Sequence, residues 1–287
     1  MSIIIREIRA EDTAAAGKII YEAFKGIAEQ HNFPPDFPSV EAGIGFAANW
    51  IGHPQVYGVA AEENGRFVGS NFLTELDPIR GVGPITVDPT LQARGTGRKL
   101  MEAVIERGAD APGIRLLQSA FNTRSMSLYA SLGFDVKEPI ALMTGKPSGD
   151  MTEGVEVRPM TADDMPECEA LCKKVHGFER TGDLSICLAA SKPFVAVRDG
   201  RITAYASAVS MWHLNHGVAE TEADMCDVLL GASAQITDPV SFLLPTRRAS
   251  FHRWALASGL KMIMPLSLMA MGEYNEPEGA FFPSVLY

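Results

Sequence analysis

A short glycine-containing loop is the most chemically informative part of the sequence. It reads Gln92-Ala93-Arg94-Gly95-Thr96-Gly97, follows a β-branched strand, and leads into an amphipathic helix that begins with Arg98 and Lys99. The first turn of a helix has unpaired backbone N–H groups and the positive end of the helix dipole, and glycine lets a ligand approach the backbone. With basic side chains around the same turn, this segment predicts a binding site for an anion.

Two common phosphate-binding motifs do not fit the loop. A Walker loop needs Lys-Ser/Thr after its second glycine, whereas Arg98-Lys99 follows here, and a dinucleotide fingerprint needs a third glycine where Leu100 stands. The hexapeptide Gln92–Gly97 instead resembles the Gln/Arg-x-x-Gly-x-Gly/Ala signature of the GNAT superfamily of acyl-CoA-dependent N-acyltransferases.

A second segment strengthens this resemblance. Residues 122–134 begin with Asn122, have Tyr129 seven positions later, and close with Leu132-Gly133-Phe134, similar to the later motif of the same family. Glycine is also the residue preferred just after a helix. Two motifs in the family's order indicate a GNAT fold for residues 1–147.

The resemblance implies a role for each matching residue. The backbone of Ile85, Thr86 and Val87 would pair with the pantetheine arm of acetyl-CoA, the co-substrate. The pyrophosphate would be held by the loop Gln92, Ala93, Arg94, Gly95, Thr96 and Gly97 and by Arg98, while Asn122 would position the cofactor. Tyr129 would protonate the departing thiolate; the alternative is that it only packs beside Leu128 and Leu132. The amine attacks the thioester directly, so no covalent enzyme intermediate is expected.

The general base is not assigned by the resemblance. Histone-type members carry a glutamate on the strand before the loop, and the matching position here is Gly81, which cannot accept a proton. Glu75 and Asp77, at the end of the preceding strand, are the nearest candidate catalytic carboxylates, and a water relay is the third option. Asp88 is expected to orient the turn instead.

The acceptor side is specified only in outline. In this fold the first two helices and their connection cover the acceptor, so an aromatic-lined amine site is expected, with Glu29 or Asp36 as an acidic partner. Its aromatic candidates are His31, Phe33, Phe37 and Trp50, which could equally pack the connection onto the domain. The expected acceptor is a small-molecule amine, with a cationic one favoured by the acidic chain.

Composition limits the other possible partners. The 287 residues carry 25 Lys and Arg against 35 Asp and Glu, a net charge of −10. Phosphate backbones and anionic membranes need a basic surface, so no nucleic acid and no membrane partner are expected. The sequence shows no signal peptide and no apolar run of about 18 residues, which predicts a cytoplasmic protein. An oligomer is compatible with the sequence.

The chain contains an imperfect duplication. Ile5–Asp12 aligns with Val157–Asp164, the predicted hairpin 59–69 with 194–204, and the helix-glycine unit 127–134 with 253–260. A Pro/Gly/Ser cluster near residue 147 suggests a boundary, so we expect domains 1–147, with the acetyl-CoA site, and 148–287. The fold class is α/β (α+β): two tandem GNAT-like domains, each a mixed, mostly antiparallel twisted sheet flanked by helices.

Within the first copy the pattern predicts each element by its range. Strands are expected at 3–8, 57–62, 67–75, 82–87 and 114–118, two more within 134–144, and helices at 12–30, 40–51, 95–108 and 124–131. These elements place the loop 92–97 between a strand and a helix, where anion binding requires it.

The second copy has lost the residues that would bind the cofactor. Residues 220–231 carry four carboxylates where the pyrophosphate loop should lie, which would repel an anion. Trp212, His213 and His216 could line a ligand pocket or simply pack. Cys168, Cys172 and His176 have helical spacing that suits either a metal or a buried apolar stripe; with no fourth ligand evident, the stripe is favoured and no metal is expected.

Two functions follow from these patterns. The favoured one is an N-acetyltransferase that moves an acetyl group from acetyl-CoA to a small amine or aminoacyl group, with the second domain in an acceptor-site or interaction role. The alternative is a non-catalytic acyl-CoA sensor. Tyr129 and the complete loop favour catalysis. The sensor hypothesis is retained because Gly81 stands where histone-type members have the strand glutamate.

Overall fold

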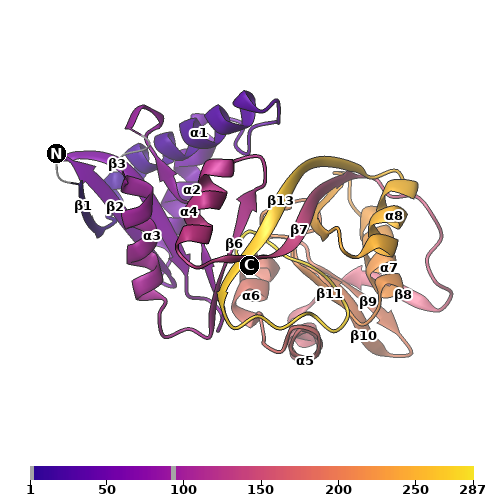
Figure 1. Ribbon diagram of the computed structural model, residues 1–287. Coiled ribbons are helices and arrows are strands. Elements are labelled where there is room, and N and C mark those ends of the chain that lie inside the picture. The colour runs from indigo at the N-terminus through magenta and orange to yellow at the C-terminus, as the bar shows by residue number, and fades with distance from the viewer. Residues whose placement is uncertain (1–2, 92–94) are drawn as a thin grey trace.

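A computed structural model gives the arrangement of the chain and describes residues 3–91 and 95–287. Two lobes lie side by side, and strands from both halves of the sequence cross between them (Figure 1). The described strands form a nine-stranded sheet and a five-stranded sheet, with helices packed on them. The predicted α/β class with two tandem GNAT-like copies is confirmed.

The first copy contains these elements: β1 (Ile3–Glu7), α1 (Thr13–Gln30), α2 (Val40–Gly52), β2 (Val56–Glu63), β3 (Arg66–Thr74), β4 (Arg80–Val82), β5 (Thr86–Val87), α3 (Thr96–Arg107), β6 (Gly113–Ser119), α4 (Thr123–Ser131) and β7 (Asp135–Gly145). Short 3₁₀ turns lie at Ala10–Asp12 (η1) and Pro89–Leu91 (η2). The predicted strand 82–87 is divided into β4 and β5, and the two strands expected within 134–144 are one long strand.

The second copy repeats this order: η3 (Ala162–Asp164) follows β8 (Val155–Pro159), and then come α5 (Met165–His176), α6 (Thr181–Ala190), β9 (Phe194–Arg198), β10 (Arg201–Ala206), β11 (Gly217–Ala219), α7 (Glu222–Ser233), β12 (Val240–Pro245), α8 (Ala249–Ala257), β13 (Lys261–Gly272) and β14 (Ala280–Phe282). The predicted hairpins are β2–β3 and β9–β10, antiparallel pairs with positive φ at Asn64-Gly65 and Asp199-Gly200.

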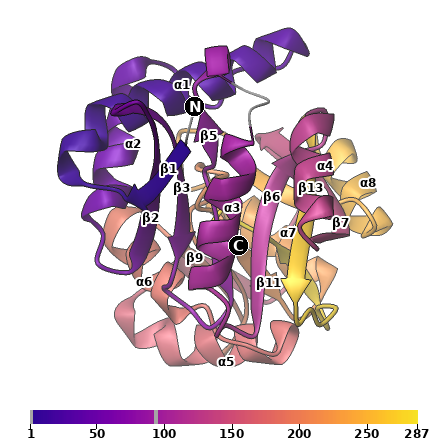
Figure 2. The same cartoon turned by 60° about the vertical axis from the view of Figure 1, so that its left-hand side comes forward.

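The two faces of the first copy's sheet are covered by different helices. Adjacent residues of a strand point to opposite faces. Phe72 is buried with Ala16 of α1 and Ala47 of α2, whereas Leu73 is buried with Leu100 of α3. Figure 2 shows α3 lying across the front of these strands, with α1 and α2 beyond them.

The two copies exchange strands within the large sheet. The order is β1-β2-β3-β4-β6-β13-β7-β12, so β13 of the second copy lies between β6 and β7 of the first. In turn β7 pairs with β12 and β13, with Leu142 opposite both Leu243 and Met264. The predicted boundary near residue 147 falls in the segment between β7 and β8 and stays a prediction, because one sheet continues across it.

The duplication is also visible in side-chain chemistry. Arg6 binds Asp12 through two contacts of 2.7 and 2.9 Å, and Arg158 binds Asp164 through two of 2.8 and 2.7 Å. Each aspartate also accepts the backbone N–H three residues before it, from Arg9 or Thr161, at 2.8 Å. These aspartates therefore close the 3₁₀ turn that precedes each helix and do not cap the α-helix itself.

The cysteine spacing in α5 produces the expected apolar stripe. Cys168, Leu171, Cys172 and Val175 are buried in one cluster with strands β9 to β11. Across residues 3–91 and 95–287, no group of three or more metal-ligating side chains is close enough to hold a metal ion. The helices in those ranges also include none with the length and apolar character needed to cross a membrane.

Candidate functional site

An open cleft of about 760 Å³ lies on the first copy. It is lined by the second half of α1, the strand β5, the start of α3, and the loop that leads from β6 into α4. The predicted cofactor residues that line it are Ile85, Thr86, Val87, Gly95, Thr96, Gly97, Arg98 and Asn122. Gln92, Ala93 and Arg94 lie outside the described residues. Segments far apart in sequence thus meet at one cavity.

The wall formed by β5 has an edge available for a ligand. On one side β5 pairs with β3, with Ser70 opposite Thr86 and Gly69 opposite Val87. On the other side of the sheet, β6 pairs with β4 at Arg80–Gly81 opposite Ile114–Arg115. This described pairing ends before β5, so it leaves the second edge of β5 without a strand partner. An extended, amide-bearing chain could therefore add along β5 as a further strand.

The start of α3 offers backbone N–H groups. Gly95 precedes the helix with φ of +82°, a left-handed conformation that glycine adopts without strain, and no described side chain caps this end. Lys99 N–H already bonds to the Gly95 carbonyl at 3.2 Å, and no described acceptor pairs with the N–H groups of the three residues before it. Arg98 stands beside them and donates to Ser131 Oγ at 2.6 Å. This end of α3 can bind a pyrophosphate.

The start of α7, the equivalent helix of the second copy, is not available to a ligand. At the start of α7 the Thr221 hydroxyl accepts the Asp224 N–H at 3.2 Å, so a side chain occupies the place that a ligand would need. Glu220 pairs with Lys174 at 2.9 Å and with Arg201 at 3.2 Å. In addition, β14 pairs along β11, the strand that comes before α7 as β5 comes before α3.

Asn122 and Tyr129 lie on the same wall of the cleft. Asn122 Oδ1 accepts the Ser125 N–H at 3.2 Å and so begins α4, while its own carbonyl accepts Gln118 Nε2 at 2.8 Å. Tyr129 is only 7% exposed, its ring lies edge-on to Phe134, and burial raises the pKa of its phenol well above the ordinary value. No described group hydrogen-bonds to the hydroxyl, which stays protonated at neutral pH and can donate into the cleft. Packing and proton donation are both compatible with this position.

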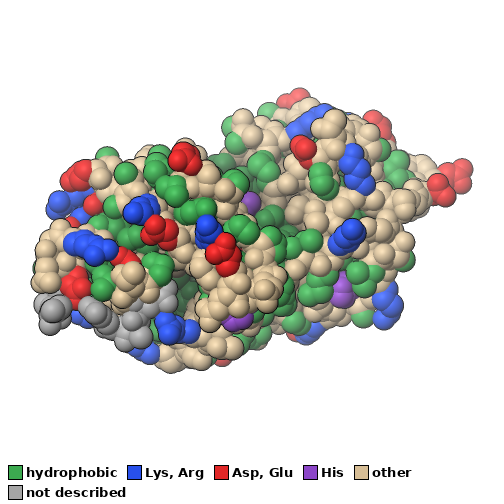
Figure 3. All heavy atoms as spheres, turned by 90° about the horizontal axis from the view of Figure 1, so that it is seen from above, with side chains coloured by type: hydrophobic (Ala, Val, Ile, Leu, Met, Phe, Trp, Pro, Cys, Tyr) green, Lys and Arg blue, Asp and Glu red, His purple; other side chains and the backbone are tan. Residues whose placement is uncertain are grey.

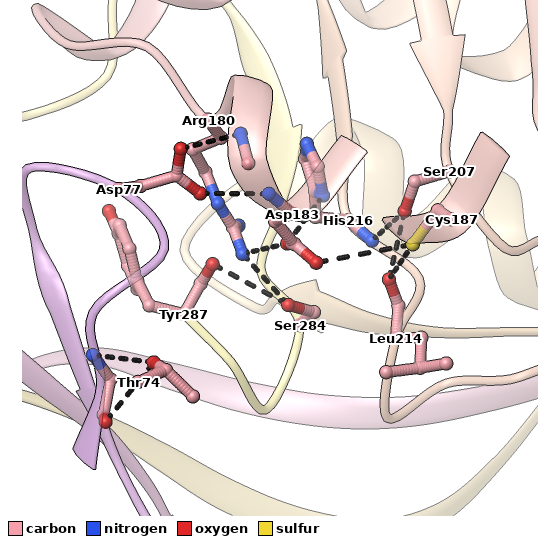
Figure 4. A network of polar contacts seen from close by, with 12 residues as sticks. Thr74, Asp77, Arg180, Asp183, Cys187, Ser207, Leu214, His216, Ser284 and Tyr287 are labelled. Atoms are coloured by element: carbon pink, nitrogen blue, oxygen red, sulfur yellow. Dashed lines mark hydrogen bonds and ion pairs between the residues drawn. The ribbon is translucent and has the colours of Figure 1, made fainter. Parts of the chain in front are cut away.

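The two predicted carboxylates are engaged elsewhere, and neither lines the cleft. Glu75 forms two contacts of 2.9 Å with Arg107 at the far end of α3. Asp77 accepts the N–H groups of Gly182 and Asp183 at 2.8 and 3.0 Å, and so caps the first turn of α6 (Figure 4). Burial raises the pKa of Asp77. The geometry assigns these carboxylates to structural contacts, because neither faces the space where an amine would be deprotonated.

Gly81 is glycine for a steric reason. A Cβ at this position would overlap the backbone carbonyl oxygen of Leu286 and crowd the Thr74 hydroxyl. Near Leu286, Ser284 accepts Arg180 Nη2 at 2.9 Å, in a buried network that also contains Asp183 and His216 (Figure 4). A segment of the second copy thus occupies the space that a side chain at position 81 would need.

The proposed acceptor residues separate into two groups. Phe37 and Trp50 pack with Phe24 and Phe46 against α1 and α2, as the packing alternative expected. His31 lines the cleft, and Phe33 stacks on Phe121 with ring centroids 4.5 Å apart. Phe121 also lines the cleft and had not been singled out, although its place beside Asn122 at the end of β6 was the signal for it.

The acidic and second-copy candidates are also placed. Glu29 forms an ion pair with Lys25, at 3.8 Å. Asp36 is half-buried, and loss of solvent raises its pKa to about 6. Trp212 stacks on His213 with centroids 4.2 Å apart, and burial lowers the pKa of His213 to about 4. His216 is fully buried against Tyr205, so it belongs to the packing of the second copy.

Comparison with known proteins agrees with this geometry. Residues 20–134 match the model of the acetyltransferase (GNAT) family, whereas no curated protein matches the sequence. A putative acetyltransferase from Pyrococcus horikoshii is 18% identical with a TM-score of 0.69, covering 97% of this chain and 91% of that one. A GCN5-related N-acetyltransferase from Sphaerobacter thermophilus is 16% identical with a TM-score of 0.64, covering 97% and 98%.

A third solved structure has the same tandem organisation. It is a tandem GNAT protein from the clavulanic acid biosynthesis pathway, 12% identical with a TM-score of 0.57, covering 96% of this chain and all of that one. At these identities the structures establish the fold alone. The chain therefore has the fold of tandem GNAT proteins, and its residues 20–134 match the model of the acetyltransferase (GNAT) family.

Proposed function

We propose that the protein transfers an acetyl group from acetyl-CoA to the amine of a small molecule or an aminoacyl group. The observation that carries the proposal is the cleft of about 760 Å³, where an unpaired strand edge, an uncapped helix start and a protonated tyrosine meet. The shape suits a long cofactor with an anionic end and an amide-bearing arm.

Each wall of the cleft has one task in this proposal. Acetyl-CoA supplies an activated acyl group as a thioester. The start of α3 with Arg98 holds the pyrophosphate, and β5 aligns the arm so that the acyl carbon faces the acceptor. Tyr129 donates its proton to the leaving sulfur. The phenol still carries this proton at neutral pH because burial raises its pKa.

The second copy, residues 148–287, takes the acceptor-side role in the proposal. It binds no acyl-CoA of its own, which the capped start of α7 and the β14 strand on β11 both support. It supplies β13 beside β6 and the Leu286 carbonyl against Gly81. A cationic acceptor is favoured by the net charge of −10.

Two measurements test the proposal together. Calorimetry measures acetyl-CoA binding, and thiol release across a library of polyamines, amino sugars and aminoacyl amides measures transfer. Binding with turnover on at least one amine is the expected result. Tight binding with no turnover on any amine would instead support the acyl-CoA sensor, and absence of binding would refute both.

A further inference from the structure

The proposed transfer needs a group that removes a proton from the acceptor. An amine is mostly an ammonium ion at neutral pH and cannot attack a thioester until it loses a proton. Glu75 and Asp77 hold Arg107 and the start of α6, and Gly81 has neither a side chain nor room for one. The base must therefore come from another part of the cleft or from solvent.

The chemistry of the cleft wall leaves one side chain for this task. Among the described residues that line it there is no aspartate or glutamate. Arg98 and Arg124 are cations, and Tyr129 keeps its proton because burial raises the pKa of its phenol. Residues 92–94, outside the described part, are Gln, Ala and Arg by sequence and add no base. His31 is the remaining residue that can accept a proton.

The contacts of His31 fix which ring nitrogen is available. Its Nδ1 lies 2.9 Å from the carbonyl oxygen of Ile27. A carbonyl oxygen only accepts, so Nδ1 carries the hydrogen and donates it, and Nε2 has the lone pair. No described group hydrogen-bonds to Nε2. The backbone thus holds the tautomer that a general base requires.

The ring is also held in position. Its centroid lies 5.3 Å from that of Phe121, which stacks on Phe33 at 4.5 Å. His31 follows the last residue of α1, at the carbonyl end of that helix. Aromatic faces beside it also suit an approaching ammonium ion.

We propose that His31 is the general base of the acetyl transfer, an assignment that rests on the proposed function. His31 Nε2 takes one proton from the acceptor ammonium and passes it to solvent. The neutral nitrogen forms a bond to the acyl carbon, and the carbon–sulfur bond breaks. Tyr129 gives its proton to the sulfur and regains one from the nitrogen through water, so each turnover gives amide, thiol and one released proton.

The test uses the full chain and two substitutions at His31. His31→Asn keeps a side-chain N–H that can donate to the Ile27 carbonyl but has no proton acceptor of comparable basicity. We expect kcat to fall about 10²–10⁴-fold, the usual contribution of a general base, with unchanged acetyl-CoA affinity by calorimetry and unchanged melting temperature. His31→Ala should lose activity similarly and regain part of it with added imidazole, which a packing role would not produce.

His53→Asn is the matched control. His53 follows α2, away from the cleft wall, and its Nδ1 accepts the Gln55 N–H at 3.1 Å, a bond that Asn can replace. This variant should keep the wild-type kcat. If the wild type turns over and His31→Asn is equally active, the assignment of His31 is wrong while the proposed function stands. The same conclusion follows if His31→Asn loses only affinity for acetyl-CoA. Absence of turnover in the wild type would overturn the proposed function and His31 with it.

Discussion

Substitutions of Gly97 can separate the effect of side-chain bulk from the effect of negative charge at the predicted pyrophosphate site. It lies in the first turn of α3, and among the described atoms a Cβ there meets only Leu128 Cδ2, at 3.5 Å, an ordinary van der Waals contact. Gly97→Ala should therefore fold and bind acetyl-CoA nearly as the wild type does. Gly97→Asp places a carboxylate at the same turn, beside the N–H groups that would hold the anion.

The expected effect of the charge follows from its distance. With an effective dielectric constant of about 20, one pair of like charges about 8 Å apart repels by about 2 kcal/mol, which corresponds to about a 30-fold weaker Kd. The pyrophosphate carries more than one charge, so about 30-fold is the lower end of the expected loss. Salt screens such repulsion, and the ratio between Asp and Ala variants should shrink between about 0.05 and 0.5 M salt.

Calorimetric titration of acetyl-CoA into the wild type and both variants measures this effect, with circular dichroism melting as the check on folding. The comparison that decides is Asp against Ala, because the two share the loss of glycine. Equal affinities for the two variants at low salt would refute the placement of the pyrophosphate at α3, however well the rest of the cleft fits.

Three further outcomes are expected. Tyr129→Phe should lower kcat about 10²-fold with acetyl-CoA affinity unchanged, as expected for a lost general acid; saturating kinetics that match the wild type would remove that role. Asp77→Ala removes the acceptor of two backbone N–H groups and should lower the free energy of unfolding by about 2–3 kcal/mol in urea titrations, with kcat per folded molecule retained. A loss of kcat without loss of stability would restore Asp77 as a base. Arg158 lowers the pKa of Asp164 to about 2. The pair therefore stabilises the folded state at pH values above the unfolded pKa near 4, and this stabilisation is lost as the pH falls toward 2. Asp164→Asn should therefore lower the free energy of unfolding by about 1–2 kcal/mol at pH 7, and this difference should narrow below pH 4.

The features that sequence alone predicted are those encoded by neighbouring residues. Gly95 and Gly97 are two positions apart at the start of α3, and Asn122 begins the helix that carries Tyr129, so local spacing was enough to predict each motif by itself. The hairpin tips follow the same logic, since Asn64-Gly65 carries the positive φ values that such turns require.

The features that sequence missed depend on contacts between distant segments. Asp77 was a candidate base at a strand end, but its partners are Gly182 and Asp183, more than 100 residues later. The glycine at position 81 is explained only by the carbonyl of Leu286. His31 had been placed among aromatic candidates, and only its bond to Ile27 shows which ring nitrogen is available.

The strand exchange explains what a second copy can contribute even if it binds no cofactor, as we propose. β13 pairs with β6 up to Leu266 opposite Ser119, and the Pro265 carbonyl then accepts the Ala120 N–H at 3.1 Å. The next residues are Phe121 and Asn122, on the wall of the cleft. The second copy thus holds the segment that positions this wall, and this support depends on β13 and not on α7. Carboxylates could therefore accumulate around α7 without disturbing the first site, whereas a change in β13 that shifted its register would move Asn122 and the start of α4.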